Sequence, residues 1–397
     1  MRNKIVVMIF TFVLMIALTP LVFGKLMNAK FDKMLNQVKS EGIELKQIQD
    51  KSSYLQTDRV FEVTIPGKLL NVPEIEYIKA VVEAKFKNLP VTTADFEGVV
   101  KEIKTKNFDN RKINEFIKDK IKFFVTTPNF RVYKYKIYDT SFDLNGAVLK
   151  ITGTQGVLVY PDKNQITVAK IELKGIKKPI EISLNNFKNV YEKKNNEVLN
   201  SSSFNLKGDF GKFKFSVDNF NSKNVVIFSA GKVNSVGDLS VKDINISNML
   251  KINGIKANVK INGLDEKTVM LLQKAPRYER DRLALQLVSK GFQINAKVNV
   301  QNIDYASKNL GFIDLTLFAD IKPVKNIEEK IKADDFDFVN FEIDLKTTPT
   351  IATFLAMLDP KIAMILQNAK QTKNGIGLDI KKQNNKIFIN GKEIKSD

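Results

Sequence analysis

The sequence predicts an α+β fold, in which an elongated, mainly antiparallel β-sheet carries packed helices and follows an N-terminal transmembrane helix. Strict alternation of apolar and polar residues from Phe292 to Val300 predicts a strand with one wet face. Apolar residues at helical spacing between Pro66 and Asn129 predict a helical insertion. The apolar run from Ile5 to Phe23 predicts the membrane helix.

Residues 1–24 are interpreted as a membrane anchor. The run from Ile5 to Phe23 approaches the roughly 20 residues that a spanning helix needs, and it exceeds the roughly 7–15 residues of a signal-peptide core. A signal sequence cleaved after Gly24 remains the alternative. Because only a short tail with Arg2 and Lys4 precedes the run, we expect a single-pass inner-membrane protein with most of the chain in the periplasm.

Composition excludes several classes of function. The 397 residues are 43% hydrophobic, which is enough for a sizeable core, but they include no Cys and no His. Cysteine chemistry, zinc sites of the usual kind and the Ser-His-Asp triad are therefore absent. The net charge of +19 comes from 63 basic residues, of which only seven are Arg. Since Arg dominates bidentate recognition of phosphates and bases, we expect no nucleic-acid partner and interpret the Lys-rich composition as a solvated surface. Attraction to an anionic membrane surface remains a functional alternative.

Residues 25–65 predict a linker helix and the first strands. Met27, Phe31 and Met34 recur at helical spacing between Lys25 and Ser40, and Gly42 ends the pattern. Two strands are expected after it, from Ile43 to Gln49 and from Tyr54 to Ile65.

Residues 66–129 change to a helical period. A first helix is expected after Pro73, a second from Asp95 to Ile103, and a third near Asn110. Their apolar stripes are typical of a packed core. The first stripe contains Ile75, Ile78, Val82 and Phe86.

Residues 130–263 form the expected long antiparallel β region, and an internal repeat appears in it. "LKGIKKPIEISLNNF" runs from Leu173 to Phe187, and "LKGDFGKFKFSVDNF" runs from Leu206 to Phe220. A looser third copy covers Ile252 to Leu264. If the copies are equivalent, three residue pairs share one face of the sheet, and chance similarity is the alternative. The pairs are Ile180 with Phe213, Ile182 with Phe215, and Leu184 with Val217.

Residues 264–397 form a C-terminal α+β region. Helices are expected from Asp265 to Ala275 and from Arg277 to Lys290, before Gly291. Two more start at Thr348-Pro349 and Asp359-Pro360, where a capping residue precedes a proline. The intervening segments alternate as strands, and the chain closes with a hairpin.

Four segments near the two ends of the chain form one pattern. They are "LTPLVFGKLMNAKFDKML", "SSYLQTDRVFEVTI", "LVSKGFQINAKVNVQNIDYASKNLGFIDLTLFADI" and "NKIFINGKEI". They resemble the YdgA-like family of bacterial envelope proteins, whose function is unknown. The resemblance implies an anchored envelope protein and brings no active site to carry over.

The best candidate for a cation site is the acidic cluster Asp334, Asp335 and Asp337. It lacks the glycine and the terminal glutamate of a calcium loop, so we expect a strand edge there and no metal. "RYERDR" from Arg277 to Arg282 is interpreted as a solvated helix face. No catalytic or cofactor-binding residue is assigned, and no cofactor is expected.

These observations predict a membrane-anchored envelope protein that binds lipid or another hydrophobic ligand in a β-lined groove. The alternative is a scaffold that binds another envelope protein. A hydrolase that works without histidine is the third class, and the absence of catalytic motifs argues against it.

Overall fold

The chain is mostly antiparallel β-sheet. The computed structural model describes residues 23–70, 74–89, 93–106, 109–144, 146–176, 179–358, 360–373, 375–383 and 385–394. Contacts divide the chain into two compact units, Met1–Lys178 and Pro179–Asp397. Each pairing between described strands is antiparallel, and the helices are short. The α+β class predicted from the sequence is therefore wrong, because strands take most of the residues assigned to helices between Pro66 and Asn129.

The predicted membrane anchor from Ile5 to Phe23 lies outside the described residues, apart from Phe23. No helix in the part of the chain that the structure describes is both long and apolar enough to cross a membrane. The helix over residues 23–40 is instead amphipathic, since Met27 and Phe31 are buried and Lys30 is exposed. The predicted transmembrane helix, and the single-pass inner-membrane location with a periplasmic bulk, are therefore not supported and are withdrawn.

The first unit is one antiparallel sheet with a helix packed on it. In space the strands follow the order β1-β2-β3-β4-β5-β6-β9-β10, while β7 pairs with β8 and β8 with β10. The elements are β1 (Glu44–Asp50), β2 (Gln56–Pro66), η1 (Gly67–Leu70), β3 (Ile75–Lys87), β4 (Ala94–Thr105), α2 (Asn110–Ile117), β5 (Lys122–Thr127), β6 (Val132–Ile137), β7 (Thr140–Asp143), β8 (Ala147–Thr152), β9 (Thr154–Val159) and β10 (Lys163–Gly175).

Two of the three helices expected between Pro66 and Asn129 are strands. In β3 every second residue from Ile78 to Phe86 faces the core, and the residues between them are mostly charged. Ala80 and Ala84 complete this alternation, and both are buried. Alanine is a weak signal of burial, so without Ala80 and Ala84 the larger apolar residues of β3 recur at helical spacing. The third helix, α2, forms where predicted, with Asp109 accepting hydrogen bonds from the Arg111 and Lys112 amides.

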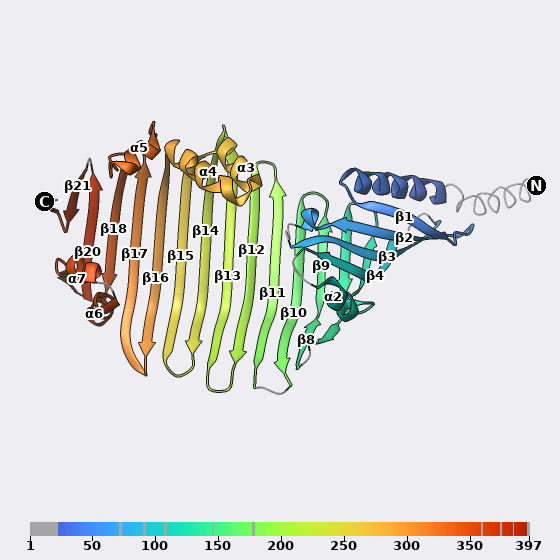
Figure 1. The fold of residues 1–397 in the computed structure, drawn as a ribbon, viewed down its shortest axis with the longest axis horizontal. Helices are drawn as coiled ribbons and strands as arrows, with labels where there is room; N and C mark the ends of the chain where they lie inside the picture. Colours follow the sequence, from blue (N-terminus) through green and yellow to red (C-terminus); the bar gives the residue numbers. More distant parts are fainter. Residues whose placement is uncertain are drawn as a thin grey trace, which may run out of the picture. The chain divides into compact units, whose positions relative to one another are not determined.

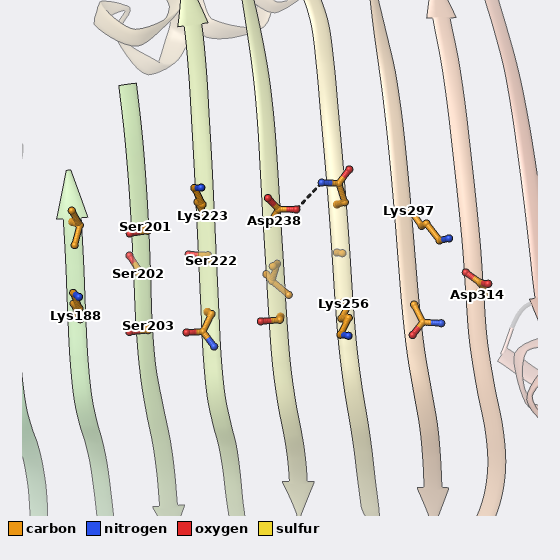
Figure 2. Close-up of a pocket in the computed structure, with 17 residues that line it drawn as sticks. Lys188, Ser201, Ser202, Ser203, Ser222, Lys223, Asp238, Lys256, Lys297 and Asp314 are labelled. Carbon is orange, nitrogen blue, oxygen red and sulfur yellow. Dashed lines mark hydrogen bonds between the residues drawn. The ribbon is translucent and has the colours of Figure 1, made fainter. Parts of the chain in front are cut away.

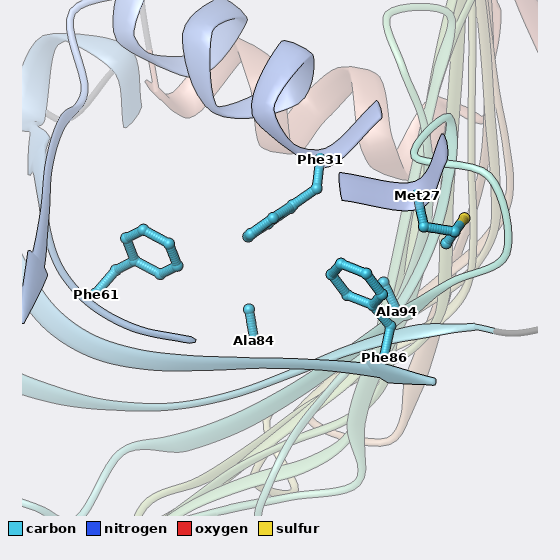
Figure 3. Packing of buried hydrophobic residues seen from close by; sticks show 6 residues of the cluster. All are labelled: Met27, Phe31, Phe61, Ala84, Phe86 and Ala94. Carbon is cyan, nitrogen blue, oxygen red and sulfur yellow. The ribbon is translucent and has the colours of Figure 1, made fainter. Parts of the chain in front are cut away.

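Phe31 holds the N-terminal helix against the sheet. Its side chain is fully buried, and it points from the helix to Phe61 and Phe86 (Figure 3). The ring centroids lie 5.9 Å from Phe61 and 5.7 Å from Phe86, both in edge-to-face geometry. Arg59 covers the Phe31 ring at 5.8 Å. Aromatic pairs of this kind each contribute about 0.5–1.5 kcal/mol beyond the area they bury.

Replacing Phe31 tests whether this ring holds the helix in place. We expect Phe31→Ala to lower the free energy of unfolding by about 3–5 kcal/mol, because it empties a fully buried site. The matched control is Leu26→Ala on the same helix, where half of the side chain is exposed. Urea denaturation of both variants checks this, and equal losses would contradict the assigned role.

The second unit is a sheet whose strands lie side by side in chain order, with helices at both ends of the strands (Figure 1). β20 pairs with β18 on one side and with β19 and β21 on the other. The strands are β11 (Glu181–Lys194), β12 (Glu197–Asp209), β13 (Lys214–Ser229), β14 (Lys232–Ile246), β15 (Leu250–Asp265), β16 (Phe292–Tyr305), β17 (Lys308–Ile321), β18 (Val339–Thr347), β19 (Lys370–Thr372), β20 (Gly375–Gln383), β21 (Lys386–Ile389) and β22 (Lys392–Ile394).

The helices of this unit are α3 (Glu266–Lys274), α4 (Arg277–Ser289), α5 (Ile327–Lys332), α6 (Pro349–Leu358) and α7 (Pro360–Leu366). Four of these helices lie where the sequence predicts them, whereas α5 was not predicted. Asp265 caps α3 by accepting a 2.9 Å hydrogen bond from the Thr268 amide. Gly291 follows α4 with a φ of +73°, a conformation that favours glycine.

The internal repeat corresponds to equivalent strands. Ile182 of β11 and Phe215 of β13 lie in one row across β12, with Gly208 between them. Leu184 and Val217 lie in the next row, with Leu206 between them. Each copy ends in an Asn-Phe pair whose Asn has a left-handed backbone, with φ of +54° at Asn186 and +52° at Asn219. Ile180 and Phe213 precede their strands, so strand pairing does not relate them.

Gly208 leaves room for the ring of Phe215 in the paired strand. A Cβ added there would lie 2.2 Å from the Phe215 ring, whereas one at Gly237 would have no atom nearer than 3.9 Å. We expect Gly208→Ala to destabilise the protein by about 1–3 kcal/mol through overpacking. Gly237→Ala is the matched control and is expected to be neutral or stabilising by up to about 1 kcal/mol. Thermal unfolding compares the two, and similar shifts would contradict the packing role.

Candidate functional site

One face of the second sheet is almost wholly aliphatic in its central region. Directly paired residues share a face, so the strand register defines rows that run across the sheet. In one row Val298 of β16 lies between Ala257 and Leu315. We call the surface made by three such rows the aliphatic face. It comprises Leu239, Val241, Ile255, Ala257, Val259, Ala296, Val298, Val300, Ile313, Leu315, Leu317, Ile343, Leu345, Leu378 and Ile380.

The helices cover this face only near the strand ends. Val233 lies on the same side of β14 as Leu239, and it is 3% exposed where α3 contacts β14 and β15. At the opposite strand ends α6 contacts β17. Between these ends most of the aliphatic face is half-buried, as Leu239, Val298 and Leu315 are. Within the described residues of this unit, no second layer covers the middle of this apolar surface.

The opposite face of the same sheet is polar and forms a shallow hollow of about 740 Å³. Lys223, Asp238 and Lys297 stand on it from β13, β14 and β16 (Figure 2). Asp238 accepts a 2.7 Å hydrogen bond from the Asn258 amide group, and the lysines are exposed. This face is the solvated lysine surface that composition predicts, and its lining holds both signs of charge.

The acidic cluster at the end of α5 is organised around a lysine. Lys330 Nζ donates to Asp335 Oδ2 at 2.6 Å and to Asp337 Oδ1 at 2.8 Å. These hydrogen bonds, first to Asp335 and then to Asp337, raise the pKa of Lys330. Within the described ranges no group of acidic side chains has the arrangement of a metal site. Asp334 lies beside the pair in a left-handed turn.

The charge run from Arg277 to Arg282 lies on α4, as predicted. Arg280 Nε donates to the Ala275 carbonyl at 3.2 Å, and Tyr278 is 82% exposed. The run is therefore local helix structure and solvated surface.

The first unit contains an apolar cleft of about 390 Å³ that the sequence did not suggest. One wall is the end of the N-terminal helix, with Met34 and Val38. The other wall comes from β5, β6 and β9, with their flanking residues. We call it the tyrosine cleft, because Tyr133, Tyr135 and Tyr160 line it together with Phe130. The alternation of Tyr133 and Tyr135 with Lys134 and Lys136 is the sequence signal that could have revealed it.

The tyrosine hydroxyls are anchored. Tyr133 donates to the Phe130 carbonyl at 2.8 Å, and Tyr135 donates to the Gln165 carbonyl at 3.2 Å. Burial raises the pKa of both phenols. Tyr160 donates to the Glu41 carboxylate, and this hydrogen bond, more than burial, raises the pKa of Tyr160. The rings are therefore fixed neutral walls at physiological pH.

Comparisons with protein-family models, with curated proteins and with solved structures find no match for this chain. The resemblance to the YdgA-like family stays a prediction, because nothing in these comparisons bears on it. Function must therefore be argued from the chemistry of the two apolar surfaces.

Proposed function

We propose that the protein binds long apolar chains, such as the acyl chains of lipids, on the aliphatic face of its second unit. The supporting observation is that one row of aliphatic side chains crosses six neighbouring strands, β14 to β18 and β20, with shorter aliphatic rows on either side of it. Among the described residues of this unit, nothing covers the middle of these rows. Soluble proteins rarely expose a continuous apolar surface of this kind unless it meets a partner.

The composition of the face favours acyl chains over a protein partner. The residues that make up the aliphatic face are Ala, Val, Ile and Leu, and the hydroxyl of Thr347, which pairs with Ile313 in one of its rows, is buried and donates to the Phe312 carbonyl. The centres of protein–protein interfaces are enriched in Tyr, Trp, Phe, Met and Arg, which supply most of the binding energy. A hydrocarbon chain needs no polar anchor, and any register along an aliphatic row suits it.

Chain length gives the first test. Each buried methylene contributes about 0.8 kcal/mol, which corresponds to up to about fourfold in affinity. We expect affinity for saturated fatty acids to rise steadily from eight to sixteen carbons, as measured by displacement of a fluorescent fatty acid. Affinity that does not depend on chain length would contradict binding on an open aliphatic face.

A pair of adjacent substitutions gives the second test. Leu315 lies on the aliphatic face between Val298 and Leu345, whereas its neighbour Thr316 lies on the polar face between Lys297 and Asp344. We expect Leu315→Asn to weaken binding of the sixteen-carbon acid at least about fivefold. Thr316→Asn, which is the matched control, is expected to leave it unchanged.

The same variants separate chain binding from association with protein. If the aliphatic face packs against a second copy of this chain, sedimentation will show a dimer that Leu315→Asn dissociates, and fatty acid will not bind. Either that outcome or equal effects of both variants would overturn the proposal. Thermal unfolding of each variant controls for loss of the fold.

A further inference from the structure

The tyrosine cleft differs from the rest of the chain in the charge of its lining. The protein carries +19, yet in the described part of the chain no lysine or arginine side chain lines this cleft. Besides the tyrosine hydroxyls, its polar side chains are Gln37 and Glu41, near the end of the N-terminal helix. The lining therefore combines aromatic rings with a single carboxylate.

We infer that the tyrosine cleft binds an organic cation, namely an ammonium group carrying a short apolar chain. Aromatic rings attract cations through the negative face of the ring, and clusters of such rings are a known means of holding quaternary ammonium groups. Tyr133, Tyr135, Tyr160 and Phe130 supply four rings to one cavity. Its volume of about 390 Å³ lies within the roughly 300–1,000 Å³ of small-molecule sites.

Glu41 supplies the charge that distinguishes a cation from a neutral ligand. Its carboxylate accepts a hydrogen bond from the Tyr160 hydroxyl, 119 positions away in the sequence, and this bond holds the carboxylate at the cleft. A carboxylate offers about four lone-pair sites, so one hydrogen bond leaves capacity for an ammonium group. An anion entering the same cleft would meet this carboxylate and no compensating cation.

The apolar residues of the cleft would contact the alkyl chain of the ligand. Met34, Val38, Val125 and Leu158 also line the cleft. They suit a short alkyl chain, and Met adapts readily to different apolar shapes. The inference concerns the first unit alone, so it does not rest on the function proposed for the second.

The test compares three probes with the same six-carbon chain: hexyltrimethylammonium, hexyl sulfate and hexanol. We expect the cation to bind at least about tenfold more tightly than either of the others, a difference of about 1.4 kcal/mol. Isothermal titration measures the affinities. Tyrosine fluorescence provides a local signal, because the chain has nine Tyr and no Trp.

Three variants assign the effect. Glu41→Gln is expected to reduce the preference for the cation over hexanol to about threefold or less. Tyr160→Phe keeps the ring and frees the carboxylate, so the preference is expected to persist. The matched control is Glu62→Gln, which neutralises an exposed carboxylate on β2 outside the cleft and is expected to change nothing. Thermal unfolding confirms that each variant is folded.

Equal binding of the three probes would overturn the inference, as would equal effects of Glu41→Gln and Glu62→Gln. A six-carbon chain would bind the aliphatic face of the second unit only weakly. The Leu315→Asn variant measures how much of the observed binding occurs on that face. If Leu315→Asn abolishes cation binding and Glu41→Gln does not, the site is on the second unit and the inference fails. Failure of fatty-acid binding on the second unit would leave this experiment unaffected.

Discussion

The alternation of side chains along a hydrogen-bonded strand is the constraint on which the second unit depends. Each backbone ladder places every second side chain on the same face, so one aliphatic row continues from β14 to β20. Cross-strand pairs such as Val298 with Leu315 stabilise the sheet locally, by up to about 1 kcal/mol each. A single layer cannot bury both faces, and the short helices protect only the strand ends. An apolar surface therefore follows directly from the sequence pattern.

Left-handed residues mark register corrections in β11 and β13, near the strands that carry the aliphatic face. A strand that gains one residue would turn all following side chains to the other face. The extra residues near Asn186 and Asn219 are absorbed in bulges, and Leu184 and Val217, just before these bulges, pair through Leu206. The Asn-Phe endings of the two repeat copies thus mark where β11 and β13 correct their register. In the third copy the left-handed positions are glycines, Gly254 with a φ of +65° and Gly263 with a φ of +83°.

Sequence periodicity predicted the elements well where large aliphatic residues alternate, as from Phe292 to Val300. It failed in β3, where the core positions Ala80 and Ala84 carry small residues. The larger residues then looked like a helical stripe, which comprised Ile75, Ile78, Val82 and Phe86. The tyrosine cleft could not be predicted from one sequence, for a different reason. Glu41 and Tyr160 are 119 residues apart, and they meet because the helix packs on one part of the sheet while β9 closes another. Such a site depends on the order of strands in space, which periodicity does not encode.

The high positive charge of the chain does not contradict a cation site in the first unit. Charges on exposed lysines are screened over about 8 Å at physiological ionic strength, so net charge acts weakly beyond the nearest residues. In the tyrosine cleft, the proposed selectivity depends on the groups that would touch the ligand, namely the aromatic rings and Glu41. On the proposed function, the aliphatic face of the second unit would distinguish ligands by the apolar area they bury. The two proposals therefore rest on different physical quantities, charge in the cleft and length of the apolar chain on the sheet.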